Sequence, residues 1–366
     1  MKRIIFTANS VFSLTNFRLN LILKCNNLKH DVVCLVPKND DYQKLLQEKI
    51  KFQTIKLLPK GLNPFNELLT IVHILYKCWK IRPNIVFSYT IKNTVYFGLG
   101  CYFFRYSFYP TINGLGSLVR SSRFSSKIVR IVLRLALYKA DKIYCQNSDI
   151  QKFLIKKKFI KENNSAVLPG SGVDLKKFTF EKLPQEHDVV FLFIGRLLKS
   201  KGIDLFVKAA KILEDSGANA SFKIIGRGDP NDNDCYHKEM LYELKLSSCI
   251  SYDGFRADVR SDLKACHCVV LPSSYDEGVP HSLLEAASMG RLIITTSKPG
   301  CREVVVSGIN GFILEEITVD CVAQKMFEII NWSEEERKAA GIFSRNIAEK
   351  KFDEDLVIDE YMALID

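Results

Sequence analysis

Cations cluster in the stretch Gly195 to Gly202, which reads Gly-Arg-Leu-Leu-Lys-Ser-Lys-Gly. It directly follows an apolar run at Val189–Ile194, which predicts a strand, and precedes a helical pattern that opens near Ile203. Loops in this position lie at the carboxyl edge of a parallel sheet, where ligands bind. Its glycines allow the backbone to bend, and Arg196 and Lys201 are suited to grip a diphosphate. The alternative is an ordinary solvated basic loop.

A second cluster is acidic and spans Tyr275 to Glu285, again just after a predicted strand, Cys268–Leu271. Pro280 suits the first position of a helix, so Glu277 precedes the helix and Glu285 falls in its second turn. The N–H groups of a helix start favour a phosphate, and carboxylates accept hydrogen bonds from sugar or ribose hydroxyls. The alternative is a helix whose N-terminal acids are stabilised by its dipole.

The elements that would position these clusters alternate along the chain as short strands and helices, which predicts parallel sheets with crossover helices. In the first half we predict strands at Arg3–Phe6, Val32–Val36 and Asn84–Tyr89, and helices at Asn16–Leu28, Phe65–Lys80 and Asn93–Phe104. In the second half we predict about five strands: Val189–Ile194, Phe222–Ile225, Ile250–Tyr252, Cys268–Leu271 and Leu292–Thr296. A Pro- and Gly-containing polar stretch after Leu168 separates the halves. The fold class is therefore α/β, with two doubly wound domains at 1–168 and 169–366.

Length and composition are those of a globular protein, with 366 residues of which 47% are hydrophobic. Lys and Arg total 52 against 41 Asp and Glu, a formal charge of +11 that favours phosphates, nucleic acid or acidic lipid as partners. Nucleic acid is disfavoured because no recognition motif is present. The eleven cysteines lack metal-ligand spacing, which favours a reducing compartment and predicts no metal site. No secretory signal or membrane-spanning run is predicted.

A basic amphipathic stretch, Lys127 to Lys139, leaves two interpretations open. It could lie on an anionic membrane surface, or it could be a crossover helix that faces the core and has a solvated basic side, and the two can coexist. Its apolar stripe consists of Ile128, Ile131, Val132, Leu135 and Ala136, and the cations off the stripe are Lys127, Arg130 and Arg134.

The two clusters together resemble the retaining glycosyltransferases of family four, which have the GT-B fold: two Rossmann-like domains facing a cleft. The resembling features are Gly-Arg with a following Lys-Gly, and two glutamates eight apart around Gly-Val-Pro. The resemblance covers essentially the whole chain and includes residues 111–116, 170–174, 300–305 and 310–312. Segments 16–18 and 90–92 resemble the branch that builds capsule, O-antigen and other surface polysaccharides in bacteria.

The resemblance implies roles for individual residues. Arg196 and Lys201 would hold the donor diphosphate and Glu277 would contact the donor sugar, which makes these three the catalytic set. Glu285 would take the ribose hydroxyls. Further donor contacts would come from the backbone of Gly278 and Val279, and from the loop 254–256 with Arg256 beside the base. The last helix would pack back on the N-terminal domain.

The first domain departs from the family pattern at two points. Many relatives have a glycine-rich loop after the first strand, but residues 8–13 contain no glycine, and Ser10 is the candidate to serve instead. Many also have a His where Asn113 precedes Gly114. Asn can donate a hydrogen bond to a sugar but cannot exchange a proton near neutral pH. The alternative for Asn113 is a turn residue with a left-handed backbone.

The resulting functional prediction is transfer of a hexose or N-acetylhexosamine, with retention, from a nucleotide sugar to a polyprenyl-diphosphate-linked acceptor. UDP is the default nucleotide by family frequency. The enzyme would need no cofactor and no metal, because two side-chain cations stabilise the leaving diphosphate, and it would act as a cytoplasmic, peripheral protein at the inner membrane face. The alternatives are a nucleotide-sugar epimerase of the same fold and a non-catalytic nucleotide-sugar-binding protein.

Overall fold

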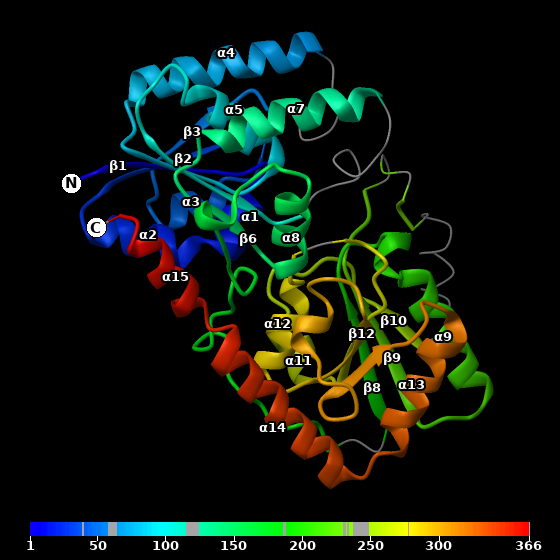
Figure 1. The fold of residues 1–366 in the computed structure, drawn as a ribbon. Helices are drawn as coiled ribbons and strands as arrows, with labels where there is room; N and C mark the ends of the chain where they lie inside the picture. Colours follow the sequence, from blue (N-terminus) through cyan, green and yellow to red (C-terminus); the bar gives the residue numbers. More distant parts are fainter. Residues whose placement is uncertain are drawn as a thin grey trace. The chain divides into compact units, whose positions relative to one another are not determined.

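A computed structural model describes residues 1–38, 40–57, 64–114, 124–185, 188–229, 232, 234–236, 249–276 and 278–365 (Figure 1). The chain divides into two compact units. The first is Met1–Ser171 together with Asp355–Asp366, and the second is Gly172–Glu354. The boundary expected from the sequence, between residues 168 and 169, lies three residues before the division in the structure.

The first unit contains a seven-stranded parallel sheet in the order β3-β2-β1-β4-β5-β6-β7. Successive side chains along a strand point to opposite faces of the sheet, so the apolar side chains form two cores, one on each face. Ile4 and Phe6 lie in one core and Ile5 in the other. The strands are β1 (Arg3–Thr7), β2 (Asp31–Pro37), β3 (Phe52–Ile55), β4 (Ile85–Ser88), β5 (Ser107–Ile112), β6 (Ile143–Cys145) and β7 (Ser165–Val167).

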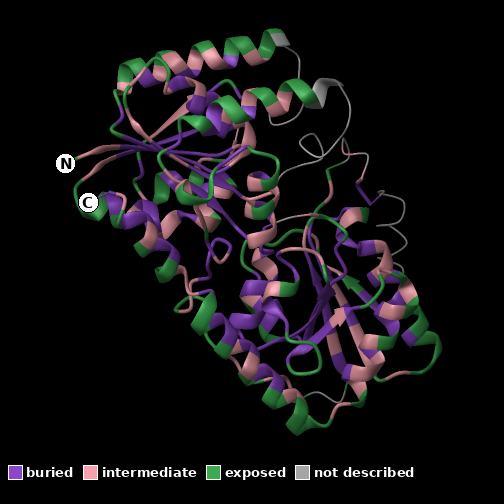
Figure 2. Cartoon of the chain, viewed as in Figure 1, coloured by how far each residue is buried: buried purple, intermediate pink, exposed green. Residues whose placement is uncertain are grey.

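Helices cover both faces of this sheet, as the buried strands in Figure 2 show. They are α1 (Val11–Phe17), α2 (Leu19–Asn27), α3 (Gln43–Gln47), α4 (Pro64–Ile81), α5 (Ile91–Gly100), α7 (Phe124–Tyr138), α8 (Ser148–Lys156), the 3₁₀ turn η1 (Glu162–Asn164) and α15 (Glu354–Met362). Val357 and Tyr361 of α15 lie in the same core as Ile4.

The single helix expected at Asn16–Leu28 is wrong. The structure has two helices, α1 and α2, which meet at Arg18. Arg18 takes a non-helical φ of −141°, and its guanidinium carbon lies 4.8 Å from the centroid of the Tyr89 ring and 5.7 Å from that of Tyr361. Its Nη1 also donates to the Ser171 carbonyl at 3.2 Å. These contacts with distant residues hold Arg18 in place and interrupt the helix.

The second unit contains a six-stranded parallel sheet in the order β10-β9-β8-β11-β12-β13. The five strands predicted from the sequence are present, and a sixth, β13, was missed. The strands are β8 (Val189–Ile194), β9 (Ala220–Ile225), β10 (Ile250–Tyr252), β11 (Cys268–Leu271), β12 (Leu292–Thr296) and β13 (Gly311–Leu314). The helices are η2 (Lys199–Lys201), α9 (Ile203–Asp215), α11 (Arg260–Lys264), α12 (His281–Ser288), η3 (Arg302–Val304), α13 (Val319–Asn331) and α14 (Glu334–Lys351).

Each sheet has a point where the chain reverses its direction of travel across the strands. In the second unit the chain goes from β8 outward to β10 and then returns to place β11 on the other side of β8. In the first unit the same reversal falls between β1 and β4. The loops leaving the two strands at such a point diverge, and the crevice between them is where open α/β sheets bind ligands.

Candidate functional site

The chain reverses direction across the second sheet between β8 and β11, which pair directly. We call this position the switch point of the sheet. The cationic segment follows β8 and the acidic segment follows β11. Their loops are bonded to each other: the backbone N–H groups of Ser274 and Tyr275 donate to the Ser200 carbonyl at 2.8 and 3.1 Å. Gly202 of the cationic loop also lies close to Pro272, which follows β11. Its φ is +78°, and a Cβ there would lie 2.3 Å from the Pro272 carbonyl oxygen, so only glycine fits this position without a shift.

The two predicted phosphate ligands have different surroundings. Lys201 ends the 3₁₀ turn η2, and only 8% of the residue is exposed. Its Nζ lies 5.7 Å from the centroid of the Tyr275 ring, so the aromatic face of one loop supports the cation of the other. Arg196, two residues after β8, is exposed. The loop therefore offers one cation held in a partly desolvated position and one in contact with solvent.

Helix α12 supplies the other side of this crevice. It begins at His281, and Pro280 is its N-cap, one position earlier than the first helical position expected from the sequence. The extended backbone of Pro280, with ψ of 122°, explains the difference. Gly278 and Val279 are buried just before the helix start. An uncapped helix N-terminus is a suitable site for an anion, and no Pro280 side-chain cap occupies the N–H groups of α12.

Glu285 lies in the second turn of α12, as predicted, and its Oε1 is 2.9 Å from Nδ1 of His281. Sequence reasoning missed His281, although its spacing of four residues from Glu285 is the signal that would have found it. The contact orients the Glu285 carboxylate. Glu277, predicted to contact the donor sugar, lies outside the described residues.

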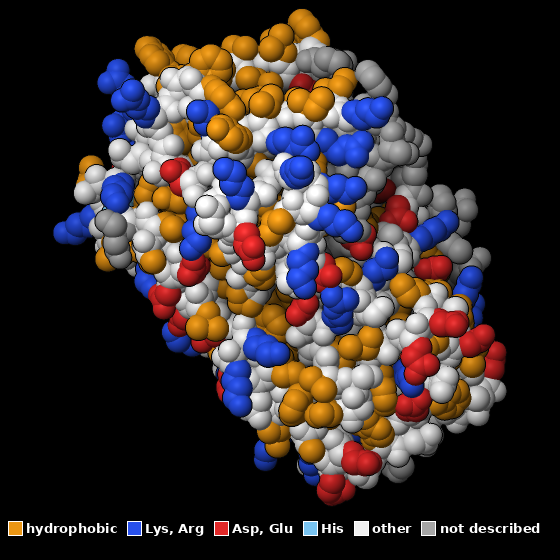
Figure 3. Space-filling view, viewed as in Figure 1, with side chains coloured by type: hydrophobic (Ala, Val, Ile, Leu, Met, Phe, Trp, Pro, Cys, Tyr) orange, Lys and Arg blue, Asp and Glu red, His pale blue; other side chains and the backbone are white. Residues whose placement is uncertain are grey.

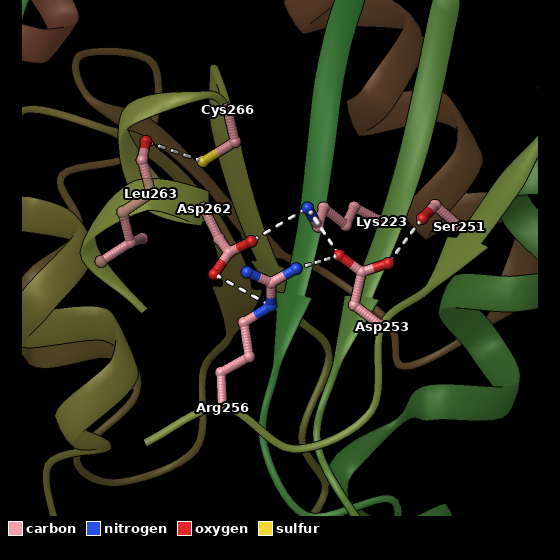
Figure 4. Close-up of polar contacts among 7 residues, drawn as sticks. All are labelled: Lys223, Ser251, Asp253, Arg256, Asp262, Leu263 and Cys266. Carbon is pink, nitrogen blue, oxygen red and sulfur yellow. Dashed lines mark hydrogen bonds and ion pairs between the residues drawn. The ribbon is translucent and has the colours of Figure 1, made fainter. Parts of the chain in front are cut away.

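The loop predicted to border the base is anchored by a ring of alternating charges (Figure 4). Lys223, on β9, contacts both Asp253 and Asp262 with Nζ–O distances of 2.9 Å. Arg256 closes the ring, with Nη2 2.6 Å from Asp253 and Nε 3.6 Å from Asp262. The hydrogen bond from Lys223 lowers the pKa of Asp253 from 3.8 to about 2. Asp253 is thus ionised at neutral pH, and the ring of contacts fixes the loop to the sheet.

The ring bears on the role predicted for Arg256. Its guanidinium already contacts two carboxylates, and Asp262 is only 2% exposed. The structure therefore shows Arg256 positioning the loop, and its contact with a nucleotide stays a prediction. Gly254, at the turn of the loop, has a φ of +74° with open space beyond its Cα.

Three ligand residues were predicted in the first unit. Ser10 follows β1, and Asn113 and Gly114 follow β5. The Ser10 hydroxyl caps α1, accepting from the Ser13 backbone at 3.2 Å and lying 2.8 Å from the Ser13 hydroxyl. Asn113 Nδ2 donates to the Tyr89 carbonyl at 2.8 Å, which links the ends of β5 and β4. Gly114, next to it, is partly exposed. Asn113 is not among the residues with a positive φ, so it does not adopt the left-handed backbone that a turn Asn can tolerate.

The Asn113 side chain also has a buried acceptor. Its Oδ1 is buried and has no hydrogen-bond partner within the part of the chain that the structure describes. Buried polar atoms are usually paired, so this oxygen is suited to accept from a ligand hydroxyl or water.

Family models match both halves of the chain. Residues 3–147 match the model "Glycosyl transferase 4-like", and residues 175–346 match "Glycosyl transferases group 1". The second match contains both motif loops and the charge ring.

Curated relatives match most or all of the chain. The N,N'-diacetylbacillosaminyl-diphospho-undecaprenol alpha-1,3-N-acetylgalactosaminyltransferase of Campylobacter jejuni is 26% identical, covering 100% of this chain and 98% of its own. The UDP-Gal:alpha-D-GlcNAc-diphosphoundecaprenol alpha-1,3-galactosyltransferase of Escherichia coli is 23% identical over 88% of this chain and 85% of its own.

Solved structures share the fold. Anabaena HepE, in complex with UDP and glucose, has a TM-score of 0.79 at 18% identity, covering 100% of this chain and 99% of its own. Sucrose-phosphate synthase from Thermosynechococcus elongatus has a TM-score of 0.81 at 15% identity, covering 100% and 98%. With two parallel sheets, and with the glycosyl transferase 4-like and group 1 models matched in its first and second halves, the chain is a glycosyltransferase with the GT-B fold.

Proposed function

We propose that this enzyme transfers a hexose or N-acetylhexosamine from a UDP-sugar to a polyprenyl-diphosphate-linked glycan during synthesis of a surface polysaccharide. The Campylobacter and Escherichia coli relatives act, by their names, on sugars linked to undecaprenyl diphosphate. The second of them is named for a UDP-sugar donor, and HepE binds UDP. These names support the proposal for both substrates.

The observation that carries the donor assignment is the crevice between β8 and β11. It combines the Lys201 ammonium above the Tyr275 ring with the N-terminus of α12. Breaking the sugar–phosphate bond leaves negative charge on the diphosphate, and preorganised cations stabilise that charge as it develops. Partial desolvation of Lys201 strengthens the interaction relative to a fully hydrated lysine.

Other residues of the two motif loops are in place for the remaining contacts with the donor. We propose that Arg196 shares the diphosphate with Lys201 and that Glu285 accepts from the ribose hydroxyls while His281 orients it. Glu277, with Gly278 and Val279, would contact the sugar. The leaving phosphate would take the proton of the acceptor on the same face of the sugar, which gives retention at the anomeric carbon.

We propose that no divalent ion is required, because the side-chain cations occupy the role a metal would have. The sequence contains Asp-x-Asp at 232–234, a pattern that could hold a metal–diphosphate complex. The Asp234 carboxylate, however, already accepts hydrogen bonds from the Ser200 backbone N–H at 3.1 Å and from the Ser200 hydroxyl. Its structural task is to hold the η2 turn that carries Lys201.

The test is mass spectrometry of reactions between the purified protein, a panel of nucleotide sugars, and lipid-linked acceptors with one or two sugars. We expect one new glycan mass for a UDP-sugar, unchanged by EDTA, and an axial anomeric linkage in the NMR spectrum when the donor sugar is α-linked. An epimerised donor without transfer would establish the epimerase alternative, and it is detected in the NMR spectrum because epimerisation leaves the mass unchanged. Donor binding without turnover across the panel would establish a binding protein.

A further inference from the structure

Helix α4 is apolar on two opposite faces. One face packs into the first unit through Ile74 and Cys78. The other face is exposed although it consists of large apolar and aromatic side chains at intervals of three and four residues: Phe65, Leu68, Leu69, Val72, Tyr76 and Trp79. Large exposed apolar patches mark contacts with proteins or membranes, so the outward face of α4 is a candidate for such a contact.

Helix α7 repeats this arrangement in the same layer. Leu133, Ala136 and Leu137 are buried, and Leu133 and Leu137 share a core with Ile74 of α4. Its exposed apolar residues are Ile128, Ile131, Leu135 and Tyr138, and Tyr102 and Phe103 are exposed after α5. The core-facing interpretation of this stretch is confirmed for Leu133, Ala136 and Leu137, whereas Ile128, Ile131 and Leu135 of the predicted apolar stripe are exposed, and the membrane interpretation stays a prediction.

Figure 3 shows hydrophobic side chains gathered over α4 and α7, with Lys and Arg side chains around α7. We call the exposed side chains of α4, α7, Tyr102 and Phe103 named above the α4–α7 face. Figure 1 shows both helices on the same side of the first sheet.

The charges around the α4–α7 face are almost all positive. The sequence of α7 contains no Asp or Glu, and Lys127, Arg134 and Lys139 are exposed on or just beyond it. On α4 the one acidic residue, Glu67, is bound to Lys92 with an Nζ–Oε1 distance of 2.8 Å. A positive rim around an apolar, aromatic face matches the layering of a membrane surface, where anionic headgroups lie above acyl chains.

The aromatic residues of the α4–α7 face also favour a membrane surface. Trp and Tyr favour the boundary between headgroups and acyl chains, and Trp79, Tyr76 and Tyr138 are all exposed on this face. Insertion would be shallow, because no helix in the described part of the chain combines the length and apolarity that crossing a bilayer requires. A helix lying in the interface plane is the form that such a face takes.

We propose that the α4–α7 face is a docking surface for an anionic lipid bilayer, with α4 and α7 lying in the headgroup region and Trp79 at its lower boundary. The inference concerns the first unit alone and goes beyond the sugar transfer proposed above. It is tested by lipid binding without donor or acceptor, so its outcome is separate from that of the proposed reaction.

The chain contains two tryptophans, Trp79 and Trp332, which makes Trp79 a site-specific reporter once Trp332 is replaced. In a Trp332→Phe background, vesicles of phosphatidylglycerol and phosphatidylcholine should shift Trp79 emission to the blue, and brominated acyl chains should quench it. Vesicles of phosphatidylcholine alone should bind more weakly, and salt should weaken binding to the anionic vesicles. Unchanged Trp79 emission at saturating anionic vesicles would overturn the proposal.

Two matched variants separate this face from general surface hydrophobicity. Val72 on α4 is 56% exposed, and Ile342 on α14 of the second unit is 53% exposed. Val72→Asp should weaken cosedimentation with anionic vesicles by about tenfold or more, because an acid at the interface loses apolar contact and meets like charge. Ile342→Asp should bind as the parent does. Both should melt like the parent and retain turnover on a detergent-dispersed acceptor.

Two other results would count against the bilayer. Equal vesicle binding by Val72→Asp and the parent would exclude this face as the contact. A parent protein that is dimeric by sedimentation velocity, and that Val72→Asp converts to a monomer, would instead identify the face as the contact between two copies of the chain.

Discussion

The carboxyl edges of the two sheets are built differently. In the second unit the loops after neighbouring strands are tied together through the backbone: Gly195 N–H donates to Ile225 at 3.1 Å and Gly226 N–H donates to Gly254 at 2.8 Å. In the first unit a backbone bond also joins strand ends, from the Tyr89 N–H to the Thr7 carbonyl at 3.1 Å, but the predicted ligands Ser10 and Asn113 make their own contacts through side chains. Backbone ties leave little freedom to reorganise, which suits a site that must stabilise developing charge.

This difference teaches where substitutions should matter. A framework of loops that contact one another transmits a change at one position to its neighbours, whereas a side chain with one local bond affects little beyond itself. The largest losses should therefore fall at the edge of the second sheet, and the smallest at the edge of the first.

The largest effect is expected from removing the cations. Lys201→Ala and Arg196→Ala should each lower turnover by about two to three orders of magnitude, the usual cost of losing one electrostatic donor. The measurement is kcat at saturating donor, with Lys208→Ala on the exposed side of α9 as the matched control. Near-normal turnover in both Lys201→Ala and Arg196→Ala would remove the proposed role of the loop.

The contact between the two motif loops predicts the next largest effect. Gly202→Ala should destabilise the second unit by about 3 kcal/mol, because a left-handed backbone and a Cβ 2.3 Å from the Pro272 oxygen both oppose it. Gly217 also has a positive φ, +71°, but no atom lies within 4 Å of the position that an added methyl group would take. Gly217→Ala should therefore cost only about 1 kcal/mol.

Chemical denaturation measures both glycine variants. If the two lose equal stability, the close approach at Pro272 contributes nothing and backbone strain alone explains the result. A Gly202→Ala protein that retains both stability and turnover would show that the loops are not held together as the structure has them.

Much of the second sheet could be predicted because buried parallel strands are continuous apolar runs between turn signals. The bounds of Val189–Ile194, Ile250–Tyr252 and Leu292–Thr296 agree with the structure. The strand β13, Gly311–Leu314, was missed because it begins with glycine, which in a sequence pattern indicates a turn. Its place in the sheet depends on Gly311, whose φ of 142° lets it lie against the Ile293 carbonyl.

Contacts between site residues could be predicted where the order of the strands brings their loops together. They could not be predicted where they depend on how side chains from distant parts of the sequence pack. Strand adjacency brings the loop of Lys201 to that of Tyr275, so their meeting followed from the motifs. The charge ring did not, because Lys223 and Asp262 are far from one another in the sequence and carry no mutual spacing signal. Without knowledge of the charge ring, Arg256 was therefore predicted to contact the nucleotide.

The charge ring should give an intermediate effect. Asp262→Asn removes a buried carboxylate from Lys223 and Arg256. The expected loss is about 1–2 kcal/mol, below the usual cost of breaking a buried pair, because both cations are partly exposed and keep Asp253. Urea unfolding at neutral pH measures it, with the exposed Asp215→Asn as control. A loss no larger than that of Asp215→Asn would contradict the anchoring role.

Acid should weaken the same ring in a defined window. The pKa of Asp253 is lowered from 3.8 to about 2, so its contribution to stability is present above about pH 4 and is lost as pH falls toward 2. The stability difference between the parent and Asp253→Asn should shrink across that window, as followed by urea unfolding at successive pH values. A difference that stays constant down to pH 2 would rule out an ionised Asp253 as its source.

The smallest effect is expected at Asn113, and it tests the other side of the comparison. Asn113→Ala removes one hydrogen bond to the Tyr89 carbonyl and a buried oxygen without a described partner. The two changes oppose each other, because losing a bond costs about 1 kcal/mol while removing an unpaired buried acceptor is favourable. Stability should therefore change by less than about 1 kcal/mol, and turnover by less than about tenfold. If Asn113→Ala instead lowers turnover as much as Lys201→Ala with stability intact, then Asn113 Oδ1 contacts the reacting sugars, and the edge of the first sheet is as much a part of the catalytic site as that of the second.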